Sequence, residues 1–137
     1  LNISPPWNQG HIRKGQGAQT KQFGGHWAVK VLKEGTYKVS LRRWPTEANH
    51  PITASLPPGK DVPGASKAFR ANDGVSLKIT TASLRINGKE IASKPVGEKD
   101  AVITFTTKLT KGSHALAPVF ISEKGETGAF YCIVETQ

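Results

Sequence analysis

The chain has 137 residues and carries 19 lysines and arginines against ten acidic residues, a formal net charge of +9. With 36% hydrophobic and 21% charged residues, the composition is typical of a folded β-rich protein and excludes a largely disordered chain. No run approaches the ~18 apolar residues that cross a membrane, so we expect no membrane partner. The length predicts a single domain, residues 1–137, and the lack of any methionine, an initiator included, indicates a piece of a larger protein.

Residues 1–25 are predicted to form a loop-like arm, because Pro5-Pro6 and several glycines interrupt any regular element. Trp7 and Phe23 are the side chains that we expect to anchor this arm to the rest of the protein.

Residues 27–31 and 37–41 alternate apolar and polar side chains, which predicts two half-buried strands. Residues 33–36 are predicted to join them as a tight hairpin, with Gly35 at the positive φ that such a turn needs. This pairing predicts one shared buried face, made of Trp27, Val29, Val31, Tyr37, Val39 and Leu41.

The second of these strands is predicted to continue to Pro45, which cannot donate to a ladder. By parity Arg43 belongs to the buried face, whereas Arg42 and Trp44 belong to the exposed one. Residues 46–67 hold four prolines and are predicted to form a long surface connection.

Residues 75–79 and 82–86 alternate on opposite parities, so the phase slip at Thr80-Thr81 predicts a β-bulge or a strand that crosses between sheets. Asn87-Gly88 then predicts a hairpin with a type I′ turn.

Three more strands are expected at 103–109, 114–121 and 128–135. The last is apolar on both faces, which predicts a central position in its sheet. Short strands separated by turn signals, with no 3.6-residue period, predict an all-β fold: an antiparallel β-sandwich of jelly-roll or galactose-binding-like type.

The sequence contains no motif of nucleophilic, phosphate-binding or metal-dependent catalysis. Four histidines are scattered without the spacing of metal ligands, and the acidic residues are not clustered. The single cysteine, Cys132, lies in an apolar strand and is expected to be a buried, inert thiol. We therefore expect no catalytic residue, no metal and no cofactor in this fragment.

The tentative ligand-binding site consists of Arg42, Arg43, Trp44 and Glu47, with His26 at the other end of the predicted hairpin. An indole beside guanidinium groups suits a sugar ring that bears sulfate or carboxylate, because the indole stacks on the sugar and arginine grips the anion. The competing interpretation is structural. Arg43 then forms a buried ion pair with Glu47 or Glu34, and Trp44 covers the end of the core.

Residues 27–48, and most specifically Leu41-Arg42-Arg43-Trp44-Pro45, resemble the C-terminal β-sandwich domain that follows the catalytic domain in many bacterial arylsulfatases, often described as N-acetylgalactosamine-6-sulfatases. Residues 6–13, 82–88 and 128–131 are similar to other segments of that domain.

The resemblance implies a non-catalytic accessory domain of an exported, periplasmic or secreted sulfatase, a sulfuric ester hydrolase. Its partners would be the catalytic domain of the parent enzyme and a sulfated glycan. Calcium and the formylglycine nucleophile would belong to that catalytic domain, because the motif Cys/Ser-x-Pro-x-Arg does not occur here and Cys132 is followed by Ile133-Val134-Glu135. We carry over no catalytic residue and expect that this fragment is not an enzyme.

The alternative to an accessory domain is a free-standing carbohydrate- or polyanion-binding module. A nucleic-acid binder is supported by the positive charge alone. No basic strand carries interleaved aromatic residues, so we do not expect nucleic acid as a partner.

Overall fold

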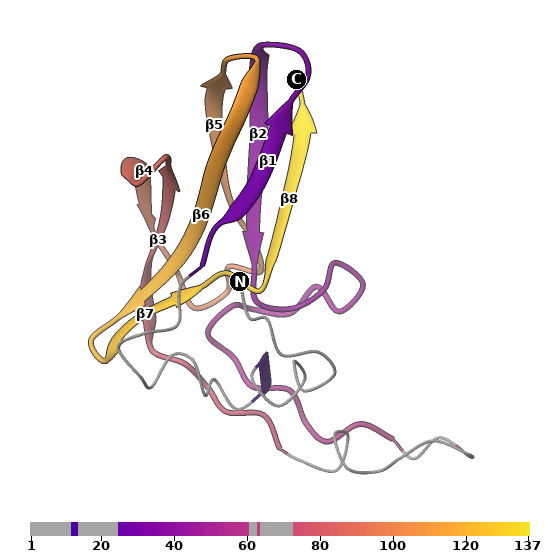
Figure 1. The fold of residues 1–137 in the computed structure, drawn as a ribbon. Coiled ribbons are helices and arrows are strands. Elements are labelled where there is room, and N and C mark those ends of the chain that lie inside the picture. The colour runs from indigo at the N-terminus through magenta and orange to yellow at the C-terminus, as the bar shows by residue number, and fades with distance from the viewer. Residues whose placement is uncertain (1–11, 14–24, 61–62, 64–72) are drawn as a thin grey trace.

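The protein is an all-β sandwich of two antiparallel sheets in the computed structural model, which describes residues 12–13, 25–60, 63 and 73–137 (Figure 1). The expectations for Trp7, Phe23 and most of residues 1–25 lie outside the described residues. No described helix is long and apolar enough to cross a membrane. The described strands are β1 (Trp27–Val31), β2 (Gly35–Arg42), β3 (Ile79–Ile86), β4 (Lys89–Pro95), β5 (Ile103–Leu109), β6 (Gly112–Ser122), β7 (Gly125–Gly128) and β8 (Tyr131–Thr136).

The first sheet has the strand order β1-β6-β3-β4, with β7 paired to β6 beyond β1, and the second has the order β5-β2-β8. The core lies between them. It is formed by completely or almost completely buried side chains of both sheets, with Ile52 added from the loop that follows β2: Val39, Leu41, Phe105, Ala82, Leu84 and Phe120.

The predicted hairpin between β1 and β2 is wrong. β1 pairs with β6, from Trp27 opposite Leu116 to Val31 opposite Gly112, whereas β2 pairs with β5 and β8. Residues 32–34 therefore connect the two sheets, and Gly35 is not among the described glycines with positive φ. Alternation shows that a strand has one buried face, but it does not identify the strand that pairs with it.

The predicted buried face is correct for the residues nearest the middle of the sandwich. Val31, Val39 and Leu41 are buried, and Val29 and Tyr37 are half-buried. Trp27 is 39% exposed, because β1 is an outer strand and Trp27 is its first residue.

Both local predictions for β3 are confirmed. The pairing of β3 with β6 shifts between Ile79 and Thr81, which is the β-bulge at the phase slip. Asn87 and Gly88 have φ values of 52° and 80° and connect β3 to β4 as the type I′ hairpin requires. β3 begins at Ile79 rather than at Val75, since the backbone N–H groups of Val75 and Leu77 donate to the carbonyls of Arg13 and Thr53 instead of to a neighbouring strand.

The last predicted strand, residues 128–135, corresponds mainly to β8, and only Gly128 belongs to β7. β7 pairs with β6, and β8 pairs only with β2 at the outer edge of the second sheet. The predicted central position is therefore wrong, and Val134 is 42% exposed.

Candidate functional site

Arg43 is fully buried, as its parity predicts, but it lies beyond the end of β2 in a bend. Its guanidinium donates six hydrogen bonds to five backbone carbonyls that come from three separate segments of the chain. The Nε atom donates to Ile12, Nη1 donates to Ile52 and Ala54, and Nη2 donates to Ile12, Arg13 and Val75, at distances of 2.7–3.3 Å.

The structural interpretation of Arg43 needs one correction. Within the described residues Arg43 forms no ion pair, and Glu47 and Glu34 are both exposed. Burial lowers the pKa of the Arg43 guanidinium to about 10, so the group is still protonated at neutral pH. Carbonyl dipoles thus take the place of the expected carboxylate, and Arg43 joins the segments that meet below the sandwich.

Trp44 is buried, with 2% of its surface exposed, contrary to the exposed position predicted from parity. Its Nε1 atom donates to the carbonyl of Pro51 at 3.0 Å, and its ring lies 4.5 Å from the Arg43 guanidinium carbon and edge-on to His50. Parity fails here because the strand ends at Arg42 and the bend turns both following side chains inward. A ring buried in this way presents no face on which a sugar can stack.

Arg42 points to the outer face of the second sheet, where it gains neighbours that the sequence did not indicate. Its Nη1 atom donates to Asn49 Oδ1 at 3.4 Å, and its cross-strand partner is Tyr131, the first residue of β8. Residues 45–49 form a turn closed by two backbone hydrogen bonds, from Ala48 to Pro45 and from Asn49 to Thr46.

Glu47 is exposed on this same turn, and its charge affects the pKa of Tyr131. Burial raises the pKa of the Tyr131 phenol, and the charge of Glu47 raises it further. We name the group Arg42, Glu47, Asn49 and Tyr131 the Arg42 patch. It combines a guanidinium, a carboxylate, an amide and a half-buried aromatic ring on one surface.

Sequence reasoning identified Arg42 and Glu47 but missed Tyr131 and Asn49. Tyr131 reaches the patch only through the pairing of β2 with β8, and no local sequence pattern predicts this pairing. Asn49 has a positive φ of 39°, a conformation that asparagine tolerates better than most residues. The asparagine itself was therefore a weak sequence signal of the turn that brings Asn49 to Arg42.

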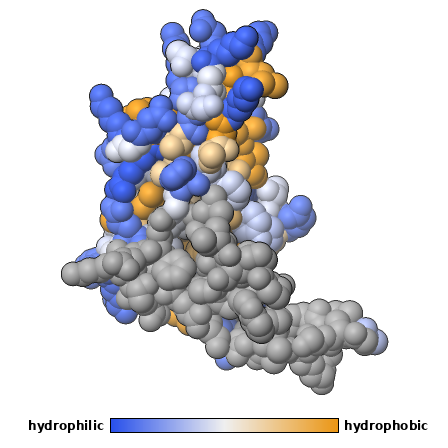
Figure 2. All heavy atoms as spheres, viewed as in Figure 1, coloured by the Kyte–Doolittle hydropathy of each residue, from blue (hydrophilic) through white to orange (hydrophobic). Residues whose placement is uncertain are grey.

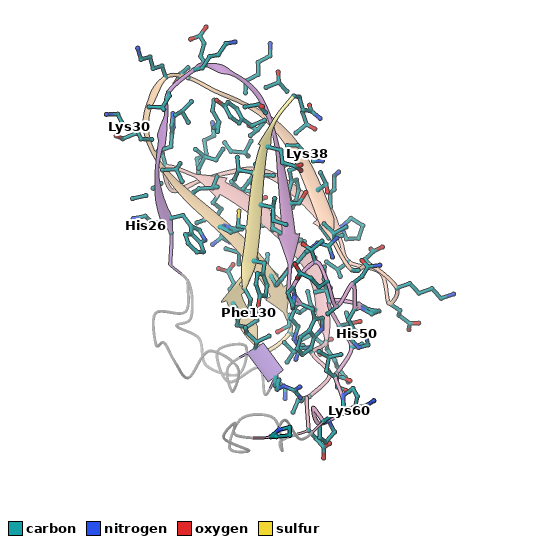
Figure 3. All side chains as sticks on the ribbon, turned by 90° about the vertical axis from the view of Figure 1, so that its right-hand side faces the viewer. His26, Lys30, Lys38, His50, Lys60 and Phe130 are labelled. Carbon is teal, nitrogen blue, oxygen red and sulfur yellow. The ribbon has the colours of Figure 1, made fainter. Side chains whose placement is uncertain are left out.

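His26 is not brought to the patch. It is exposed and directly precedes β1, the outer strand of the first sheet, whereas His50 lies beside Trp44. In the view of Figure 3 the two histidines lie on opposite sides of the sandwich. No group of three or more potential metal ligands occurs among the described histidine, cysteine and acidic residues.

Cys132 is expected to react slowly with thiol reagents in the native protein. Burial raises the pKa of its thiol to about 11, from a usual value of 9.0, which lowers the thiolate fraction at neutral pH by about a hundredfold. Labelling with an aromatic disulfide reagent at neutral pH should thus be far slower before unfolding in urea than after it. Equal rates in both states would show that the thiol is accessible and ionised like a free cysteine.

The fold and the patch define an antiparallel β-sandwich with a mixed polar and aromatic surface at one end of its second sheet. A comparison with family models gave no match, and neither did searches of curated proteins and of solved structures. The resemblance to the sulfatase domain thus stays an interpretation of the sequence.

Proposed function

We propose that this chain is a non-catalytic accessory domain of a periplasmic or secreted sulfatase, which packs on the catalytic domain and holds a sulfated glycan at the Arg42 patch. The single observation that carries the glycan site is the pairing of Arg42 with Tyr131 on the outer face of the second sheet. Tyr131, whose ring is partly open to solvent, takes the stacking role that the sequence analysis gave to Trp44, which is buried.

Each member of the patch has a separate task in this proposal. Tyr131 offers its ring to the C–H face of a sugar, and Arg42 donates two parallel hydrogen bonds to a sulfate or carboxylate group. Glu47 accepts hydrogen bonds from sugar hydroxyls, and the Asn49 amide N–H groups donate to them. The net charge of +9 adds an attraction that weakens as salt rises.

The link to a sulfatase depends on the resemblance of residues 27–48. Arg43 and Trp44, which belong to the most specific part of that resemblance, are buried and hydrogen-bonded to backbone carbonyls, so these two residues support the fold rather than a ligand site. The alternative is a free-standing carbohydrate- or polyanion-binding module. Reading the gene upstream of Leu1 decides between the two, because only an accessory domain requires an in-frame Cys/Ser-x-Pro-x-Arg motif there.

We expect the protein to bind sulfated oligosaccharides more tightly than desulfated ones at about 150 mM salt, where surface charge is screened within about 8 Å. Arg42→Ala should weaken binding of the sulfated form about tenfold, which corresponds to the loss of a charged hydrogen bond. Tyr131→Ala should weaken both forms, because it removes the stacking surface. Calorimetric titration of each variant measures these effects.

Lys108→Ala is the matched control, since Lys108 is an exposed cation in the same sheet. It lies on β5 opposite Thr36, near the end of β2 that is farther from Arg42. It should bind like the wild type. An equal loss in Lys108→Ala and Arg42→Ala, or equal affinity of the wild type for sulfated and desulfated sugar, would show that overall charge accounts for binding and that the patch is not a site.

A further inference from the structure

The two sheets are joined on one side of the sandwich and open on the other. On the joined side the Lys94 ammonium of β4 donates to the Thr104 carbonyl of β5 at 2.6 Å and lies 5.5 Å from the Phe105 ring. On the open side β1 and β8 are the outer strands of their sheets, and neither pairs with a further described strand (Figure 1). Unpaired strand edges are ready templates for another strand.

An apolar groove of about 380 Å³ lies between β1 and β8. Val29 and Val31 line it from β1, Leu109 and Leu116 come from the core, and Val134 lines it from β8. Leu32, also in the lining, is 73% exposed, and Figure 2 shows hydrophobic residues at the surface of the upper sandwich among hydrophilic ones. The groove explains why β8 keeps an apolar inner face although it is an edge strand.

The backbone of β8 offers regularly spaced hydrogen-bonding groups along this groove. Gln137 donates its N–H to the Thr36 carbonyl at 3.0 Å, which marks these two residues as a hydrogen-bonded pair of the β2–β8 ladder. Such pairs alternate in antiparallel sheets, so Glu135 and Ile133 also bond to β2. The N–H and C=O groups of Cys132, Val134 and Thr136 then point to the open edge.

The rim of the groove is basic. Lys30 and Lys33 line it, and neither forms an ion pair with a described residue. Lys30 points away from the sandwich in Figure 3. Lys38 is different, because Glu135 neutralises it at 2.7 Å. Glu34 is the one acidic residue of the connection 32–34, so the rim keeps a net positive charge.

We infer that this groove binds an extended, acidic segment of a partner protein, which adds to β8 as a further strand. Its alternate apolar side chains would enter the groove, its backbone would pair with Cys132, Val134 and Thr136, and its carboxylates would meet Lys30 and Lys33. This site is separate from the Arg42 patch, which lies at the other end of β2.

The first test is a selection of random peptides of about 12 residues, enough for one strand, displayed on phage and captured by the whole chain. We expect enriched peptides to alternate apolar and acidic residues. The best one is then synthesised, and its affinity is measured by fluorescence anisotropy. Val134→Glu should weaken binding about tenfold or more, because it places a carboxylate in the groove beside the peptide carboxylates.

The matched control is Ile91→Glu. Ile91 is 45% exposed on β4, also an outer strand, so this variant adds the same charge at a similar position outside the groove. It should bind like the wild type. The double variant Lys30→Gln/Lys33→Gln should bind more weakly at low salt and show a smaller decrease as salt rises.

Hydrogen exchange distinguishes strand addition from simple contact. In the free protein the amides of Val134 and Thr136 should exchange rapidly, and those of Ile133 and Glu135 slowly. The peptide should slow exchange at Val134 and Thr136. The proposal is overturned if no peptide is enriched, if Val134→Glu binds normally, or if these two amides are unaffected. It is also overturned if sedimentation shows a dimer that Val134→Glu dissociates, because a second copy would then occupy the groove.

Discussion

Replacing Arg43 by alanine is expected to destabilise the fold by about 3–5 kcal/mol. The substitution removes six hydrogen bonds at once and leaves five buried or partly buried carbonyls to find water. These carbonyls belong to segments around residues 12, 52 and 75, which the guanidinium connects in addition to backbone hydrogen bonds such as those from Val75 to Arg13 and from Leu77 to Thr53. Urea unfolding followed by tryptophan fluorescence measures the change in the free energy of unfolding.

Two further variants separate the geometry of Arg43 from its charge. Arg43→Lys keeps the charge, but a single ammonium cannot reach all the carbonyls that lie around the edge of the guanidinium, so we expect it to recover less than half of the loss. Arg42→Ala removes a cation one residue away whose hydrogen bond to Asn49 is exposed and 3.4 Å long, so it should cost less than about 0.5 kcal/mol. Small and equal effects of Arg43→Ala and Arg42→Ala would contradict the buried network.

Replacing Trp44 by alanine is expected to cost about 3–5 kcal/mol, the usual range for deleting a buried tryptophan. The indole is 2% exposed, donates to the Pro51 carbonyl, and packs beside Arg43 and His50. Trp44→Phe retains a ring and loses the N–H donor, so we expect a smaller cost of about 1–2 kcal/mol.

The Trp44 variants also test the position of the glycan site. If the indole is buried, Trp44→Phe should leave the affinity for a sulfated oligosaccharide unchanged while it lowers the free energy of unfolding. The opposite result, a stable Trp44→Ala protein that no longer binds sugar, would place the ring at the surface and return the stacking role to Trp44.

The sequence alone determined those stretches whose conformation depends on residues that are close to them in the sequence. Period-two alternation located β2 and β5, an apolar run located β6, and the change of parity at Thr80-Thr81 located the bulge in β3. Asn87-Gly88 specified its turn, because few residues other than asparagine and glycine adopt two successive positive φ values. Parity also predicted the burial of Arg43, although Arg43 lies in the bend after the strand and its partners were not predicted.

Only the tertiary structure decided which strands meet. Alternation identifies the buried face of a strand, and the partner is chosen by the packing of segments that are distant in sequence. For this reason β1 paired with β6 rather than with β2, and β8 took an edge and brought Tyr131 to Arg42. Trp44 is buried for the same reason, since the bend after Arg42 and the loop around Pro51, rather than strand parity, set the direction of its side chain.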